Sequence, residues 1–136
     1  MSKAIGIDYG TKRVGIAISD STQIIASALC AVSTNEIFKF LIDLVEKEKV
    51  DTIVVGVAKN LDDTDTDSTL VIQQFIEKIK VLFPQVKVCS VDERFTSKIA
   101  FQTIIDSGIK KKKRQNKSLI DEVSATIILQ DYLSYK

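Results

Sequence analysis

Short apolar runs open this chain, and their spacing predicts a group of antiparallel strands. The runs cover Lys3–Tyr9, Val14–Ser19 and Ile24–Val32, and only short, turn-like segments separate them. Parallel neighbours in a sheet need a long crossover connection, whereas antiparallel neighbours can be joined by a tight turn. The N-terminal part of the chain is therefore expected to form three antiparallel strands.

From residue 35 onward the pattern changes to helices that alternate with strands. Apolar residues recur at helical spacing in four segments, Asn35–Lys49, Leu70–Phe83, Phe95–Ser107 and Ser118–Tyr135. Continuous apolar runs at Asp51–Val57 and Val86–Val91 are typical of buried parallel strands. The expected fold is α/β, a mixed five-stranded sheet of three antiparallel strands and then parallel strands, with helices on both faces. We expect a single domain over residues 1–136, because no repeat or linker interrupts this pattern.

The last helix combines large apolar residues with a step of small ones. We expect it to face inward with its large apolar side chains, Leu119, Val123, Ile127, Leu129 and Leu133. Ser124 and Ala125 follow Asp121 by three and four residues, which places all three on one side of the helix. Two small residues there allow this side to approach a sheet closely.

Composition excludes several kinds of catalytic site. The chain has 136 residues, 45% of them hydrophobic and 27% charged, as in globular proteins. It has no histidine, which rules out Ser-His-Asp and Cys-His catalysis and zinc sites that need imidazole. Cys30 and Cys89 are too few for a disulfide framework and are expected to be small buried hydrophobes. No apolar run is long enough to span a bilayer, and residues 1–20 do not resemble a signal peptide, so we expect a cytoplasmic protein without membrane contact.

The net charge of +1 hides a strongly basic segment. Residues 94–118 carry eight basic residues against Asp106 alone, a sum of +7, so the remaining residues sum to −6. The eight are Arg94, Lys98, Lys110, Lys111, Lys112, Lys113, Arg114 and Lys117. Such a segment on an otherwise acidic chain indicates a polyanionic partner. The run 110–114 contains no aromatic residue, so we expect it to contact phosphates rather than bases.

Acidic residues follow two of the expected parallel strands. Asp8 ends the first strand, and Asp92 and Glu93 end the fifth. The carboxyl ends of parallel strands meet at one edge of the sheet, where ligands bind in open α/β folds. Carboxylates gathered there need a hard cation such as Mg²⁺, and two such ions can stabilise both the attacking and the leaving oxygen of a phosphodiester displacement. Spacing alone leaves a simpler interpretation open, that these are strand-end ion pairs such as Glu93 with Arg94.

Asp121, near the start of the last helix, also has two interpretations. In one, Ser118 caps the helix and Asp121, three residues later, is favoured beside the positive helix end. In the other, Asp121 is a metal ligand that faces Asp8. Glu122 is rotated from it by about 100° around the helix, so only one of the two can point at a given site.

Four motifs in order along nearly the whole chain resemble one known family. Residues 8–17 read D-Y-G-T-K-R-V-G-I-A, residues 54–57 read V-V-G-V, and residues 92–97 read D-E-R-F-T-S. The last helix adds Lys117, Asp121, Ser124-Ala125 and the run Ile128–Leu133. These motifs resemble those of the YqgF/RuvX family, the Holliday-junction-resolvase-like proteins that are also described as pre-16S rRNA nucleases and have a ribonuclease-H-like fold.

The resemblance implies specific roles for residues of this chain. Asp8, Glu93 and Asp121 would be the catalytic carboxylates that bind Mg²⁺ or Mn²⁺, and Arg13, Arg94 and Lys117 would contact phosphate. The implied activity is a metal-dependent endonuclease acting on a 16S rRNA precursor at its 5′ end, or on branched DNA.

One segment departs from the family pattern. After the central strand the family has a Pro and a second Gly, whereas residues 56–64 here read G-V-A-K-N-L-D-D-T. Four acids crowd this region, Asp62, Asp63, Asp65 and Asp67. The run imitates a calcium-binding loop, but Ser68 and Gln74 stand where Gly and Glu are needed, so a solvated loop is the better interpretation.

Two other function classes stay open from the sequence. A nucleic-acid-binding ribosome-assembly factor without turnover would need only the basic segment, and its acids would be structural. A phosphotransferase is suggested by Asp8–Thr11, which resembles the phosphate loop of actin-like kinases, although those enzymes close two such domains around ATP. The sequence does not indicate an oligomeric state.

Overall fold

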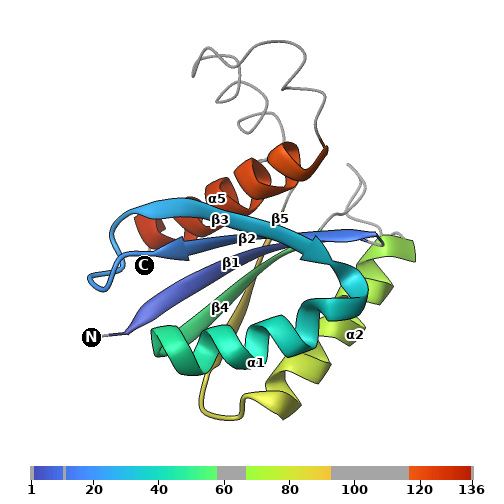
Figure 1. Cartoon of the computed structure of the whole chain (residues 1–136), viewed down its shortest axis with the longest axis horizontal. Coiled ribbons are helices and arrows are strands. Elements are labelled where there is room, and N and C mark those ends of the chain that lie inside the picture. Colours follow the sequence, from blue (N-terminus) through green and yellow to red (C-terminus); the bar gives the residue numbers. More distant parts are fainter. Residues whose placement is uncertain (1, 11, 58–66, 93–116, 136) are drawn as a thin grey trace.

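The computed structural model describes residues 2–10, 12–57, 67–92 and 117–135, and its strands form one five-stranded sheet in the order β3-β2-β1-β4-β5 (Figure 1). The strands are β1 (Lys3–Tyr9), β2 (Arg13–Ser19), β3 (Ala26–Ser33), β4 (Val50–Val57) and β5 (Lys87–Asp92). The first three pair antiparallel, whereas β4 runs parallel to β1 and β5 parallel to β4. The predicted mixed sheet is therefore confirmed.

Helices cover both faces of this sheet, as predicted. A short 3₁₀ turn, Thr34–Glu36, leads into α1 (Ile37–Glu48), and α2 is Asp67–Leu82. These two helices lie on one face, and α5 (Lys117–Tyr135) lies on the other (Figure 1). The helix predicted at Phe95–Ser107 lies outside the described residues. No helix in the described part of the chain has the length and apolar character needed to cross a membrane.

Side-chain alternation along β1 separates two cores of different character. Ile5 and Ile7 are fully buried in a large core with α1 and α2, where the ring of Tyr9 also lies 4.3 Å from that of Phe75. On the other face, Ala4 is buried in a smaller core with α5. Since successive strand residues point to opposite faces, β1 presents bulky side chains to α1 and α2 and small ones to α5.

The prediction of which α5 residues face inward was partly wrong. Val123 and Ile127 are only half-buried, whereas Leu129 is fully buried as predicted. Ala125 and Ile128, which were not among the predicted apolar residues, are also fully buried. Leu133 does pack against this core, and the side chain of Leu119 is outside the described set. The error has a physical cause: the expected face followed the largest apolar residues, whereas the helix turns its smallest residue toward the sheet.

The loop between β2 and β3 is held by Asp20, which explains why β3 begins later than expected. The Asp20 Oδ1 atom accepts hydrogen bonds from the backbone N–H groups of Ile24 at 2.8 Å and Ile25 at 3.0 Å. The Thr22 hydroxyl donates to the other oxygen. Ile24 and Ile25 are exposed in this loop, so the predicted strand Ile24–Val32 is corrected to Ala26–Ser33.

This arrangement predicts a defined acid sensitivity. The hydrogen bond from Thr22, with those from Ile25 and Ile24, lowers the pKa of Asp20 from 3.8 to about 2. A carboxylate whose pKa is lower in the folded state stabilises the fold above its unfolded pKa, and this contribution is lost as the pH falls toward the folded value. We expect Asp20→Asn to lower the free energy of unfolding at pH 7, with the difference from wild type shrinking between about pH 4 and pH 2. Urea unfolding across that range measures it, and a difference independent of pH would contradict it.

Candidate active site

Asp8 lies near the end of β1 on the face of the sheet covered by α5. Its neighbours Ile7 and Tyr9 belong to the core under α1 and α2, so alternation turns Asp8 to the opposite face. The residue is half-buried. On β2 it is paired with Gly15, and the register that joins Ile7 to Val55 places Gly56 of β4 on its other side. Glycines therefore flank the Asp8 carboxylate on both adjacent strands, and neither adds a side chain beside it.

The ends of the parallel strands meet at the edge where Asp8 lies, as the sequence predicted. Gly56 is in register with Val91 of β5, and Val57 with Asp92. The backbone of Asp92 is thus one residue beyond the level of Asp8, two strands away. Val91 packs against the core under α5. Its side chain is therefore on the same face of the sheet as that of Asp8.

Helix α5 approaches the sheet very closely at Gly6, two residues before Asp8. A Cβ atom on Gly6 would lie 2.6 Å from the Ala125 carbonyl oxygen and 2.6 Å from the Leu129 Cβ atom. Both distances are far below van der Waals contact, so only glycine fits at this position. The close approach expected from the small residues of α5 is confirmed, and Asp121 stands one turn before Ala125.

The C-terminal half of α5 is attached to both edges of the sheet. The Gln130 side chain accepts a hydrogen bond from the Ala26 N–H at 2.9 Å and donates one to the Ile24 carbonyl at 3.0 Å. At the other edge, a side-chain hydrogen bond with Tyr132 raises the pKa of Lys87, whose ammonium lies 5.8 Å from the Tyr132 ring centroid. These contacts hold the later turns of α5 at the start of β1, and its earlier turns extend toward the Asp8 end (Figure 1).

Around the axis of α5, positions 121 and 122 lie on different sides of Ala125, the residue whose carbonyl oxygen lies against Gly6. Helical geometry places Asp121 about 40° to one side of Ala125 and Glu122 about 60° to the other. Burial raises the pKa of the Cys30 thiol on β3, and the negative charge of Glu122 raises it further. Glu122 is therefore close enough to β3 for its charge to act on Cys30.

Arg13 starts β2 immediately after the turn that follows Asp8. A Cβ atom on Gly10 would lie 2.5 Å from the Arg13 carbonyl oxygen, so this turn also requires glycine. The Thr34 hydroxyl donates a 2.7 Å hydrogen bond to the Gly10 carbonyl and fixes the turn to the start of the 3₁₀ segment. Arg13 is half-buried at the same edge of the sheet as Asp8.

The remaining predicted site residues are described only in part or not at all. Lys117 and Asp121 lie in α5, but their side chains are outside the described set. The structure does not describe seven further predicted site residues, Glu93, Arg94, Lys110, Lys111, Lys112, Lys113 and Arg114. The acidic segment 58–66 also lies outside the described residues. Among the described residues no three acids or cysteines come together as a metal site. The roles of these residues stay a prediction.

Sequence reasoning assigned no structural role to the glycines around Asp8. Gly6, Gly15 and Gly56 all lie inside strands, where glycine weakens the strand and commonly marks a close approach of another backbone or a ligand. That signal was present in the sequence.

Comparison with known proteins places the chain in a family. The family model described as "RuvX: Holliday junction resolvase" matches residues 2–135. The chain belongs to the RuvX family. RuvX relatives named "Putative pre-16S rRNA nuclease" include proteins of Flavobacterium johnsoniae, 52% identical, and Bacteroides thetaiotaomicron, 47% identical. Both alignments cover 100% of this chain and 99% of the relative.

Solved structures of Holliday junction resolvases share the RuvX fold. Thermus thermophilus RuvC, in complex with a Holliday junction substrate, superimposes with a TM-score of 0.60 at 13% identity, covering 99% of this chain and 95% of RuvC. The yeast mitochondrial resolvase Ydc2 gives a TM-score of 0.61 at 10% identity, covering 98% of this chain and 78% of Ydc2. At such identities the likeness is one of fold, and it confirms the ribonuclease-H-like architecture.

The contact at Gly6 yields a direct test of how α5 is positioned. We expect Gly6→Ala to lower the free energy of unfolding by about 1–3 kcal/mol, because the added methyl group meets backbone atoms that cannot rotate away. Urea unfolding of the variant measures this loss. Ser27→Ala, at an exposed position of β3, is the control and should stay near wild type. A Gly6→Ala protein as stable as wild type would show that α5 does not pack this closely.

Proposed function

We propose that this chain is a metal-dependent endonuclease that hydrolyses phosphodiester bonds of structured nucleic acid, with the 5′ end of precursor 16S rRNA as its substrate. The observation that carries the proposal is the half-buried Asp8 carboxylate, flanked by glycines, at the strand edge toward which the early turns of α5 extend. Membership of the RuvX family supports it. We propose further that residues 1–136 form one catalytic domain that acts in the cytoplasm, where precursor rRNA is made.

In this proposal Asp8, Glu93 and Asp121 form the metal-binding group. Asp8 faces α5, Asp121 lies on α5 one turn before the Gly6 contact, and Glu93 follows Val91 by two residues. Continued strand alternation would give Glu93 the face that Val91 has. Three carboxylates are the hard oxygen donors that suit Mg²⁺ or Mn²⁺. Such ions supply charge stabilisation of the phosphoryl oxygens and an activated water.

The basic residues of the chain would hold the polyanion in place. Arg13, at the same edge as Asp8, would position a phosphate beside the carboxylates, together with Arg94 and Lys117. Guanidinium groups suit this role because they bind phosphate oxygens with two parallel hydrogen bonds. The run Lys110, Lys111, Lys112, Lys113 and Arg114 would attract the nucleic-acid backbone at longer range and without base specificity.

Replacing Asp8 tests the catalytic role. We expect Asp8→Asn to reduce cleavage of a 5′-extended 16S rRNA fragment in Mg²⁺ at least about a hundredfold, because the amide keeps the shape of the carboxylate and removes its charge. Asp43→Asn is the matched control, since Asp43 is exposed on α1 at the opposite face. RNA binding by Asp8→Asn, measured in parallel, should persist.

The same assay separates the competing functions. If Asp8→Asn cleaves as fast as wild type, the proposed site is wrong. If the wild type binds the RNA but cleaves it in neither Mg²⁺ nor Mn²⁺, the chain is a binding factor without turnover. A synthetic four-way DNA junction, included as a second substrate, tests whether branched DNA is cut in preference to RNA.

Salt dependence tests the role of the basic run. We expect replacement of Lys110–Lys113 and Arg114 by glutamine to weaken RNA binding and to make the dependence of log Kd on log salt concentration shallower, because fewer counterions are released on binding. A double variant of two exposed lysines on α1, Lys39→Gln and Lys47→Gln, is the control and should keep the wild-type slope. Equal slopes for all three proteins would exclude phosphate contact by the run.

A further inference from the structure

Thr34 holds the turn between β1 and β2 by two hydrogen bonds. Its hydroxyl donates to the Gly10 carbonyl at 2.7 Å, and its backbone N–H donates to the Lys12 carbonyl at 3.1 Å. Thr34 belongs to neither of the two strands, because it begins the 3₁₀ segment that follows β3. These bonds therefore fix the turn after Asp8 from outside the hairpin that the turn closes.

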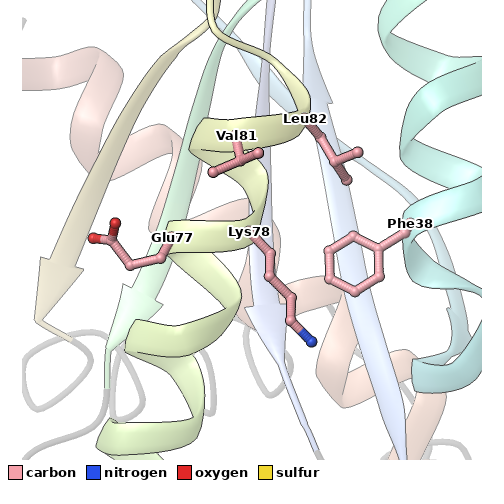
Figure 2. Close-up of a pocket in the computed structure, with 5 residues that line it drawn as sticks. All are labelled: Phe38, Glu77, Lys78, Val81 and Leu82. Carbon is pink, nitrogen blue, oxygen red and sulfur yellow. The ribbon is translucent and has the colours of Figure 1, made fainter.

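The segment that carries Thr34 is itself anchored in the large core. Ile37, three residues after Thr34, is fully buried there. The ring of Phe38 lies 5.5 Å from that of Phe75 on α2. Figure 2 shows Lys78 of α2 extending beside Phe38, and its ammonium lies 5.7 Å from the centroid of that ring. Thr34 is thus attached to a packed helix start, which makes it a firm support for the turn.

Arg13 follows this turn and is on the same face of the sheet as Asp8. Val14 packs in the core under α1 and α2, so alternation along β2 turns Arg13 to the opposite face, which is also that of Asp8. Asp8 is paired with Gly15, two residues after Arg13 on β2. Arg13 is therefore the diagonal neighbour of Asp8, and such neighbours are about 7–8 Å apart. A long guanidinium side chain spans this distance, so the backbone position of Arg13 decides where its charge lies relative to Asp8.

The backbone of Arg13 is in close contact with the peptide that Thr34 holds. A Cβ atom on Gly10 would lie 2.5 Å from the Arg13 carbonyl oxygen, so Gly10 and Arg13 close the turn against each other. We propose that Thr34 is a positioning residue for the phosphate contact of Arg13. Its hydroxyl acts through the Gly10 carbonyl and fixes the place from which the guanidinium reaches a phosphate beside Asp8. This role rests on the proposed function, in which Arg13 contacts phosphate.

A double-mutant cycle between Thr34 and Arg13 tests the coupling. We expect Thr34→Val to weaken binding of the 5′-extended 16S rRNA fragment about fivefold, because it removes the hydroxyl and keeps the branched shape. Thr34→Ser keeps the hydroxyl and should bind as the wild type does. In an Arg13→Gln background, Thr34→Val should cause no further loss, because residues that act through one another are not additive. Binding is measured in EDTA, so that metal-dependent cleavage does not interfere.

Cleavage in Mg²⁺ gives a second measurement that general destabilisation does not imitate. A contact that holds the phosphate equally in the substrate and in the transition state affects KM and not kcat. Thr34→Val should therefore raise KM about fivefold and leave kcat within about twofold of wild type. Thr52→Val is the matched control, since it removes a threonine hydroxyl that bonds to Asp51 near the start of β4, and it should leave KM unchanged. Circular dichroism checks folding, and Thr34→Ala replaces the valine variant if that variant is unfolded.

The results separate the role of Thr34 from the nuclease activity. A wild type that binds the RNA without cleaving it contradicts the nuclease, and the binding cycle then still decides the role of Thr34. Wild-type binding by Thr34→Val would overturn that role, as would an equal loss in Thr34→Ser. A loss from Thr34→Val that is the same with and without Arg13 would also overturn it. A wild type that does not bind the RNA would overturn both.

Discussion

The contact between α5 and β1 at Gly6 determines how α5 packs on the face of the sheet that carries Asp8. A helix and a sheet are normally separated by the thickness of their side chains, but here a carbonyl oxygen of α5 lies only 2.6 Å from where a Cβ atom on Gly6 would be. This contact fixes how far α5 lies from the sheet. The bonds of Gln130 to the β2–β3 loop fix its position along the strands. The two constraints together fix the described turns of α5 relative to β1.

The two faces of the sheet differ in the size of the side chains that the central strands present. Toward α1 and α2, the central strands present Ile5, Ile7 and Ile16, all fully buried, and this core is the larger of the two. Toward α5 the same strands present Ala4, Gly6 and Ala17. Bulky residues make the first layer thick and apolar. Small residues bring the second layer close, and the positions in register with Asp8 on the adjacent strands are the glycines Gly15 and Gly56.

The strands and their directions could be read from the sequence because periodicity and loop length determine them. The rotation of α5 could be read only in part: the small residue Ala125 indicated the side that approaches the sheet, but hydrophobicity also favoured Val123 and Ile127, which are half-buried. What decides between them is the close packing of Ala125 on Gly6. A helix face chosen by close packing depends on a residue more than a hundred positions away. For the site, motif and topology were enough to place Asp8 at the shared strand edge. The start of β3 was misjudged because the apolar Ile24 and Ile25 bind Asp20 through their backbones and leave their side chains in solvent.

In the proposed function, charge in the segments that flank the described strands would matter to the substrate more than the shape of the described face. At the strand edge this face presents glycine backbone and the half-buried Asp8 carboxylate, and neither of these reads the edge of a base. Two segments next to it in the sequence differ sharply in sign: the acids Asp62, Asp63 and Asp65 follow β4, and the basic run 110–114 precedes α5. In the proposed function, a polyanion would be repelled by the acidic segment and attracted by the basic run. The departure from the family pattern after Gly56 therefore changes the charge that a nucleic acid would meet in this proposal, while the described strands that hold Asp8 keep the expected order.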